Sequence, residues 1–161
     1  MSEFASVTLR AATPADQSFL LTVFASTRSD ELAALNWDSA QSKLFTQMQF
    51  SAQQQSYSGR YPSASNSIVL LDEQPIGRML VDRTEKVIEL VDIALLAEHR
   101  GRGIGSFLIR SLLGEATASG KSVRLSVYKF NPAVRLYDRL GFSPIAEDEV
   151  YSEMLWAPAV L

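Results

Sequence analysis

The sequence predicts an α/β protein built on a mixed, mostly antiparallel sheet with helices on both faces. Two observations support this fold class. Three apolar, β-branched segments, 67–71, 76–81 and 87–96, follow one another with short polar turns between them, as in an antiparallel meander. A helical segment, 106–118, then separates the third strand from another strand-like segment, 122–128. Such a crossover makes the two flanking strands parallel.

Length and composition narrow the class of protein further. The chain has 161 residues and shows no linker or repeat, so we expect a single domain over 1–161. The net charge of −3 gives no general attraction to nucleic acid or to anionic membranes. Cysteine is absent and histidine occurs once, which argues against disulfides, cysteine nucleophiles and a metal site. With no leader-like start and no long apolar run, we expect a cytoplasmic protein without a membrane segment.

The N-terminal half is predicted to contain one strand and two helices. Residues 6–10 alternate as a strand, and Thr13 with Pro14 is typical of the start of a helix, here running to about residue 26. Residues 31–35 indicate a short separate helical turn. Asp38 then serves as the N-cap of a longer helix over 39–57.

A glycine- and arginine-rich loop joins strand 87–96 to the following helix. It reads Arg100-Gly101-Arg102-Gly103-Ile104-Gly105. Glycine permits sharp turns and close approach of an anion, and the N-terminus of a helix favours negative charge. The loop matches neither G-x-x-x-x-G-K-[ST] nor G-x-G-x-x-G. It predicts a diphosphate-binding loop, the alternative being an ordinary strand-to-helix turn with exposed arginines.

The C-terminal part is predicted to add one short helix and three strands. Gly120 ends the helix before strand 122–128. Asn131 is the expected N-cap and Pro132 the first residue of a short helix that Gly141 closes. Segments 142–145 and 150–156 are the last two strands, joined by an acidic connection.

The R-x-x-G-x-G loop, together with Asn131, Tyr137 and Gly141-Phe142 downstream, resembles the GNAT superfamily of N-acetyltransferases. The resemblance is strong over the second half of the chain. It implies acetyl-CoA as cosubstrate and direct transfer of acetyl to the primary amine of a small molecule or peptide. The alternative functions are a non-catalytic sensor that binds acetyl-CoA or CoA, and a transferase for a longer acyl chain. Dimers are common in that family, so a homodimer is an expectation.

The resemblance also implies cofactor-binding residues. The pyrophosphate contacts would come from Arg100, Gly101, Arg102, Gly103, Ile104, Gly105 and Ser106. The backbone of Ile93, Ala94 and Leu95 would bind the thioester carbonyl and the pantetheine arm, where the central strand splays from its parallel neighbour. Asn131 would contact pantetheine, or serve only as a helix cap.

Two catalytic residues follow from the same resemblance. Tyr137 matches the tyrosine that protonates the departing thiolate; an unperturbed phenol, with a pKa of about 10, is protonated at neutral pH. Glu89 lies four residues before Ile93, where histone-type members carry their catalytic base. Asp92 is its rival, although in a regular strand it faces the other side unless a bulge intervenes. The remaining alternatives are a water chain as the base, and an ion pair that occupies Glu89.

The region between the first two strands helps to wall the acceptor pocket in that family. By this analogy the pocket candidates are Trp37, Phe45, Gln47, Tyr57 and Tyr61. Each of the aromatic residues could instead belong to the core. The sequence leaves the acceptor itself open.

Overall fold

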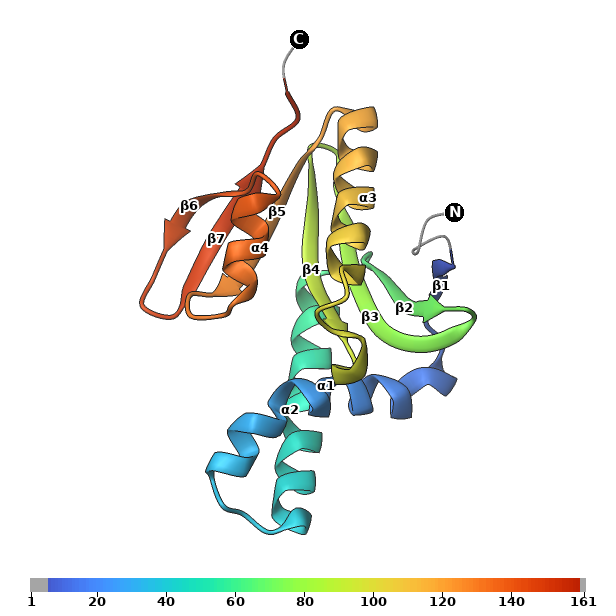
Figure 1. Cartoon of the computed structure of the whole chain (residues 1–161), viewed down its shortest axis with the longest axis vertical. Helices are drawn as coiled ribbons and strands as arrows, with labels where there is room; N and C mark the ends of the chain where they lie inside the picture. The colour runs from blue at the N-terminus through green and yellow to red at the C-terminus, as the bar shows by residue number, and fades with distance from the viewer. Residues whose placement is uncertain (1–5, 160–161) are drawn as a thin grey trace.

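The structure is a computed structural model and describes residues 6–159. One seven-stranded sheet runs in the order β1-β2-β3-β4-β5-β7-β6 (Figure 1). Its strands are β1 (Val7–Ala11), β2 (Ser65–Leu71), β3 (Gln74–Arg83), β4 (Val87–Leu95), β5 (Ser122–Tyr128), β6 (Ser143–Glu147) and β7 (Tyr151–Trp156). Only β4 and β5 pair in parallel; the other neighbours are antiparallel. The predicted meander, the parallel crossover and the mixed α/β sheet are confirmed.

Helices cover both faces of this sheet (Figure 1). They are α1 (Gln17–Ala34), α2 (Ser39–Arg60), α3 (Ile104–Ser119) and α4 (Ala133–Arg139), with short 3-10 turns at Pro14–Asp16 and Ala97–His99. Helices α3 and α4 pack into one cluster of buried residues on the sheet, and α1 and α2 pack into a second cluster around Ile68.

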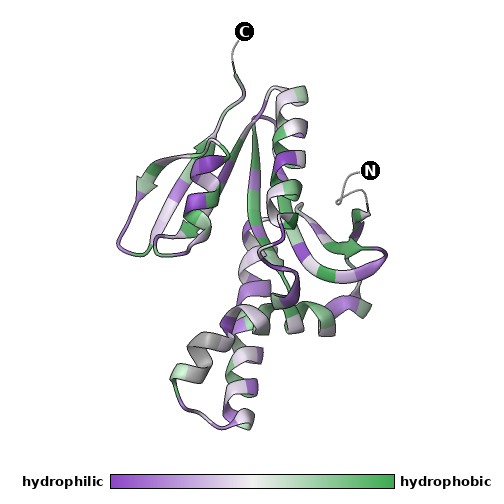
Figure 2. Ribbon diagram, viewed as in Figure 1, coloured by the Kyte–Doolittle hydropathy of each residue, from purple (hydrophilic) through white to green (hydrophobic). Residues whose placement is uncertain are grey.

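The α3 face of the sheet carries the larger core. Buried residues recur along α3 at three- and four-residue spacing, from Ile104 through Leu108 and Leu112 to Ala116. This is the stripe expected of an amphipathic helix. Apolar residues, green in Figure 2, recur along α3 and the central strands. Burial of this stripe holds the glycine-rich loop that precedes α3 in register with the end of β4.

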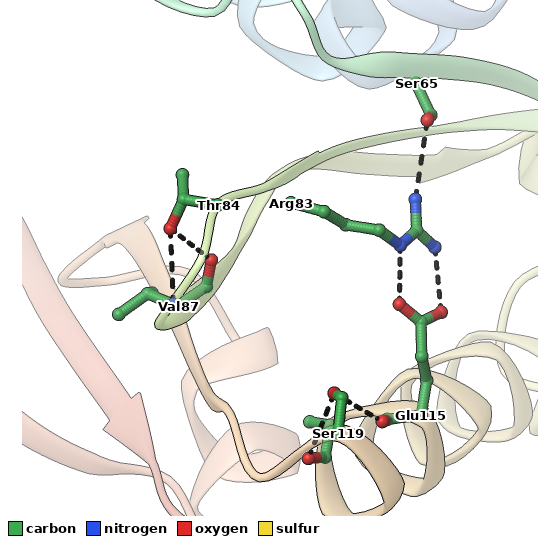
Figure 3. Close-up of polar contacts among 7 residues, drawn as sticks. Ser65, Arg83, Thr84, Val87, Glu115 and Ser119 are labelled. Carbon is green, nitrogen blue, oxygen red and sulfur yellow. Dashed lines mark hydrogen bonds and ion pairs between the residues drawn. The ribbon is translucent and has the colours of Figure 1, made fainter.

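An ion pair fixes the C-terminal part of α3 to the sheet. Arg83 at the end of β3 donates from Nε and Nη2 to both carboxylate oxygens of Glu115, at 2.5 and 2.9 Å, and reaches Ser65 (Figure 3). Close by, Thr84 and Val87 bond across the turn that starts β4. Both charged side chains are about two-fifths exposed, so the pair contributes at most about 1 kcal/mol.

The first helix differs from its prediction. It does not end near residue 26, and 31–35 is not a separate turn, because α1 continues to Ala34 without a break. No glycine or proline interrupts 17–34. The break falls at Asn36, which has a φ of 56°, and the predicted cap is confirmed because the Asp38 carboxylate accepts from the Gln41 amide at 2.7 Å.

Other boundaries shift by a few residues. Helix α3 begins at Ile104 rather than 106, because Gly103 occupies the N-cap with a φ of 84°. Helix α2 runs to Arg60, three residues beyond its predicted end at 57. Gly120 closes α3 as predicted, with a φ of 70°.

Among the side chains that the structure describes, those of 6–29 and 34–159, no group of three or more histidine, cysteine, aspartate or glutamate residues could hold a metal ion. None of the described helices has the length and hydropathy that crossing a membrane requires.

Candidate active site

The central strands β4 and β5 pair over only part of their length. Their parallel register joins 87–90 to 122–125 and then stops. Strand β4 continues to Leu95 and β5 to Tyr128, with no further pair between them in residues 6–159. Figure 1 shows the β5–β7 part of the sheet diverging from β4. The second half of β4 therefore has main-chain polar groups on this side that no neighbouring strand uses.

A β-bulge in β4 marks the start of the divergence. Residues 80–81 of β3 pair with Asp92 and Leu90, so Val91 is an extra residue on β4. One extra residue reverses the alternation of side chains beyond it. As a result Glu89 and Asp92, three residues apart, lie on the same face of the sheet. In a regular strand Asp92 would lie on the opposite face of the sheet from Glu89; the bulge places it on the same face.

Residues Ile93, Ala94 and Leu95 lie in the unpaired half of β4, where the resemblance placed them. Their partners on the other side are residues 77–79 of β3. Ile93 and Ala94 are half-buried and Leu95 is buried. Their main chain is the part of the sheet positioned to receive an extended ligand; that it binds one remains a prediction.

The glycine-rich loop leads into an N-terminus without a side-chain cap. Gly101 and Gly103 both have positive φ, 72° and 84°. Because the N-cap is Gly103, no side chain at that position accepts from the amides of 104–106. Asp and Glu are absent from this first turn. The free amides and the positive end of the helix dipole favour an anion here.

The two loop arginines differ in their surroundings. Arg100 donates from Nε to the Leu95 carbonyl at 2.9 Å and from Nη2 to the Ser26 hydroxyl at 3.0 Å, so its side chain joins the end of β4 to α1. Arg102 is exposed and lies 3.3 Å from Nδ1 of His99. The exposed Arg102 guanidinium is therefore available to an anion, whereas the Arg100 guanidinium already makes hydrogen bonds within the protein.

Tyr137 is buried between α4 and the sheet. It is 8% exposed, and its ring centroid lies 5.7 Å from that of Phe142. Burial, with the nearby charge of Asp92 as a second cause, raises the pKa of its hydroxyl to about 12. The phenol is therefore protonated over the whole neutral range and can donate a proton, as the sequence-based assignment requires.

Glu89 is buried and engaged in an ion pair. Its Oε2 accepts from Nε of Arg124, the residue opposite on β5, at 2.7 Å. Arg124 also lies 3.8 Å from Glu153 on β7. The alternative in which an arginine occupies Glu89 is thus realised in this structure. Its role as a base remains a prediction.

Asp92 occupies a different electrostatic environment. Its Oδ2 lies 3.8 Å from Nε of Arg78, beyond hydrogen-bond distance. Burial raises the pKa of this carboxyl, while Arg78, Arg28 and the Ile93 amide oppose the rise. The charge of Asp92 in turn contributes to the raised pKa values of Tyr57 and Tyr137. The charge of Asp92 therefore acts on both a tyrosine of α2 and the predicted acid on α4.

A cavity of about 640 Å³ opens between α2 and the β4–β7 strands. Polar and aromatic side chains dominate its lining, which comprises Tyr57, Arg60, Tyr61, Glu89, Leu90, Val91, Ser126, Ala146, Glu147, Asp148, Tyr151 and Glu153. Tyr57 and Tyr61 are thus brought to a cavity, as the analogy predicted. Trp37 and Phe45 instead pack on each other with centroids 5.0 Å apart, and neither they nor Gln47 line it.

Asn131 acts as a helix cap in this structure. Its Oδ1 accepts from the amide of Ala133 at 2.9 Å, and its carbonyl accepts from Val134 at 3.1 Å. Pro132 follows with the helical φ of −55°. The residue is exposed. The helix nevertheless begins one residue later than predicted, with Pro132 at the N-cap and Ala133 as the first residue of α4. The proposed contact of Asn131 with pantetheine remains a prediction.

The sequence reasoning did not single out Arg28 and Arg78, the two arginines whose charges act on Asp92. Arg78 stands in the otherwise apolar strand 76–81, and its residue is only 3% exposed. A charged residue within a buried strand is unusual without a partner, and that was the signal available in the sequence. Arg28 gave no such signal, because serines, a threonine and acidic residues surround it in α1.

Comparison with known proteins places this architecture in a family. The Acetyltransferase (GNAT) family matches residues 29–142, and the chain belongs to that family. A stretch of 60 residues is 45% identical to the uncharacterized N-acetyltransferase YobR of Bacillus subtilis (strain 168), covering 36% of this chain and 24% of that protein. The chain thus matches about a quarter of the length of that relative.

Solved structures share the whole fold. The PaiA N-acetyltransferase of Thermoplasma acidophilum, determined in complex with coenzyme A, has a TM-score of 0.71 and 18% identity, over 94% of this chain and 99% of that one. The histone acetyltransferase HPA2 and related acetyltransferase of Corynebacterium glutamicum has a TM-score of 0.66 and 23% identity, over 97% and 98%. At these identities the likeness establishes the fold.

Proposed function

We propose that this protein is an acetyl-CoA-dependent N-acetyltransferase that transfers the acetyl group directly to a primary amine. The observation that carries the proposal is the divergence of β4 from β5 beside the uncapped N-terminus of α3. An unpaired strand segment and an anion-favouring helix end lie at the two ends of one short loop. Membership of the acetyltransferase family and the coenzyme A complex of the Thermoplasma neighbour support the same ligand.

The residues present fit acetyl-CoA. The amides of 104–106 and the Arg102 guanidinium would bind the pyrophosphate, with the turns at Gly101 and Gly103 admitting it closely. The free main chain of 93–95 would bind the pantetheine arm and polarise the thioester carbonyl. Acetyl-CoA supplies the activated acetyl group. The protein would supply the base that deprotonates the amine and the acid that protonates the sulfur.

The protein must move two protons. A carboxylate on the acceptor face removes one from the ammonium before the N–C bond forms, because an ammonium has no lone pair; the nitrogen loses its second proton to solvent as the amide forms. Tyr137 donates its hydroxyl proton to the sulfur as the C–S bond breaks. Its raised pKa keeps that proton in place until a thiolate develops.

Two carboxylates are available as the base, and the surroundings favour Asp92. Glu89 accepts a charge-assisted hydrogen bond from Arg124, so one of its carboxylate oxygens is already engaged. Asp92 lies 3.8 Å from Arg78, beyond hydrogen-bond distance, and burial raises its pKa. Glu89, the residue chosen from the sequence, is the competing candidate.

The test is thiol release from acetyl-CoA against a panel of amines. Wild type should release CoA only when amine is present, and Tyr137→Phe should lower the rate about 10²–10⁴-fold, the usual contribution of a positioned acid. Asp92→Asn should cost more than Glu89→Gln; the opposite order would return the base to Glu89. Coenzyme A binding without release on a broad panel would instead favour the non-catalytic sensor.

A further inference from the structure

Arg78 places a cation inside the sheet. Its side chain is 4% exposed, and its Nε is buried with no hydrogen-bond partner in the part of the chain whose side chains are described, 6–29 and 34–159. Its described contacts are the ion pair with Asp92 at 3.8 Å and the ring of Tyr57, whose centroid is 5.9 Å from the guanidinium carbon. A guanidinium has five donors and keeps its charge in proteins. Such a group is costly to bury unless an acceptor meets it.

A second arginine repeats the pattern from another element. Nε of Arg28 on α1 is also buried without a partner, and the guanidinium lies over the Phe24 ring at 4.8 Å. Its charge acts on Asp92, as does that of Arg78. Two guanidinium Nε groups around one aspartate thus lack an acceptor among the described residues.

The location connects this group to the acceptor side of the proposed active site. Arg78 pairs in register with Ala94, and Asp92 directly precedes Ile93. Tyr57 lies against Arg78 and also lines the 640 Å³ cavity. Tyr57 thus adjoins both Arg78 and the cavity.

We propose that Arg28, Arg78 and Asp92 form a subsite for an α-amino acid, with the guanidinium groups binding its carboxylate and Asp92 receiving its amine. The two positive groups and the one negative group match the carboxylate and the amine of an α-amino acid. A carboxylate matches the planar donors of arginine, and in an α-amino acid the amine lies one carbon away. Asp92, 3.8 Å from Arg78, is placed to meet it. The side chain of the amino acid would extend into the cavity. The inference rests on the proposed function and names its acceptor class.

Matched acceptors test the proposal. L-phenylalanine is compared with phenethylamine and with L-phenylalaninamide, and L-lysine with 1,5-diaminopentane. Thiol release should give the amino acid a kcat/KM about 10- to 100-fold above its partner, the usual worth of a charge-assisted bond. Arg78→Gln should remove that preference. Equal rates for both members of each pair in wild type, or a preference for the diamine, would overturn the subsite.

Controls separate a folding defect and failure of the proposed function from failure of the subsite. Arg110→Gln makes the same change on the exposed surface of α3 and should keep the preference. If Arg78→Gln does not fold, Arg28→Gln provides the same comparison from α1. Calorimetric titration of L-phenylalanine and L-lysine into the CoA-bound protein needs no turnover. Binding that Arg78→Gln abolishes would support the subsite even if no amine were acetylated; no binding, with amine-dependent release intact, would refute the subsite alone.

Discussion

Gly77 allows β3 to approach β4 at the residues proposed to bind acetyl-CoA, and replacing it should cost stability. A Cβ at this position would lie 2.3 Å from the Ala94 carbonyl oxygen and 2.7 Å from Cδ2 of Leu95. The first contact is with backbone, which cannot rotate away. Alanine recovers about 0.4–1 kcal/mol of unfolded-state entropy. Overpacking a tight site costs about 1–3 kcal/mol. We therefore expect Gly77→Ala to lose about 1–2 kcal/mol.

Gly114 is the matched control. It occupies a solvent-exposed position in the middle of α3, and an added Cβ there would meet nothing within 4 Å. Gly114→Ala should gain about 0.5–1 kcal/mol. Urea unfolding followed by circular dichroism measures both, and thermal midpoints should move in opposite directions by about 2–4 °C per kcal/mol. Gly77→Ala should also weaken coenzyme A binding, because relief of the contact displaces 94–95. A neutral or stabilising Gly77→Ala would show that β4 yields freely and would refute this reasoning.

Further substitutions test the acid, the loop and the first turn. Because the pKa of Tyr137 is raised to about 12, acetyl transfer should show no alkaline decline from loss of this acid up to about pH 10, and a kcat profile that falls near pH 8 would contradict that role. Arg102→Gln should weaken coenzyme A binding in a salt-dependent way with an unchanged thermal midpoint, whereas Arg100→Gln should lower stability by about 1 kcal/mol, measured by urea unfolding, because its bonds are internal. Hydrogen bonding from Arg10 lowers the pKa of Asp16 in the folded protein. The Asp16 carboxylate therefore contributes fully to the free energy of unfolding above about pH 4, the unfolded pKa, and this contribution is lost as the pH falls toward the folded pKa. Thermal scans from pH 2 to 7 should show that Asp16→Asn destabilises at neutral pH and that its difference from wild type shrinks below pH 4.

Local chemistry explains which parts of the fold could be predicted. Strand alternation in 67–81 and the caps at Asp38 and Gly120 depend on neighbouring residues, so the sequence discloses them. The full extent of α1 was missed because serine and threonine weaken the helical pattern in that segment, while packing against α2 and the sheet sustains the helix.

The candidate site was less accessible to prediction for the same reason. Tyr137 and the glycine-rich loop follow local motifs, which the sequence shows directly. The bulge at Val91 leaves no mark in an apolar run, so the shared face of Glu89 and Asp92 could not be assigned. The pairing of Glu89 with Arg124 spans 35 positions, and only the sheet register reveals it.

The divergence of β4 and β5 also bears on solubility. An exposed strand edge invites pairing with other chains and so promotes aggregation. Residues 91–95 form such an edge in the middle of a seven-stranded sheet. The opposing β5–β7 strands stand across from it and helices lie on both faces, so a foreign strand would have to displace them to pair there. The fold thus keeps an open row of main-chain groups for a slender ligand while shielding it from other polypeptides.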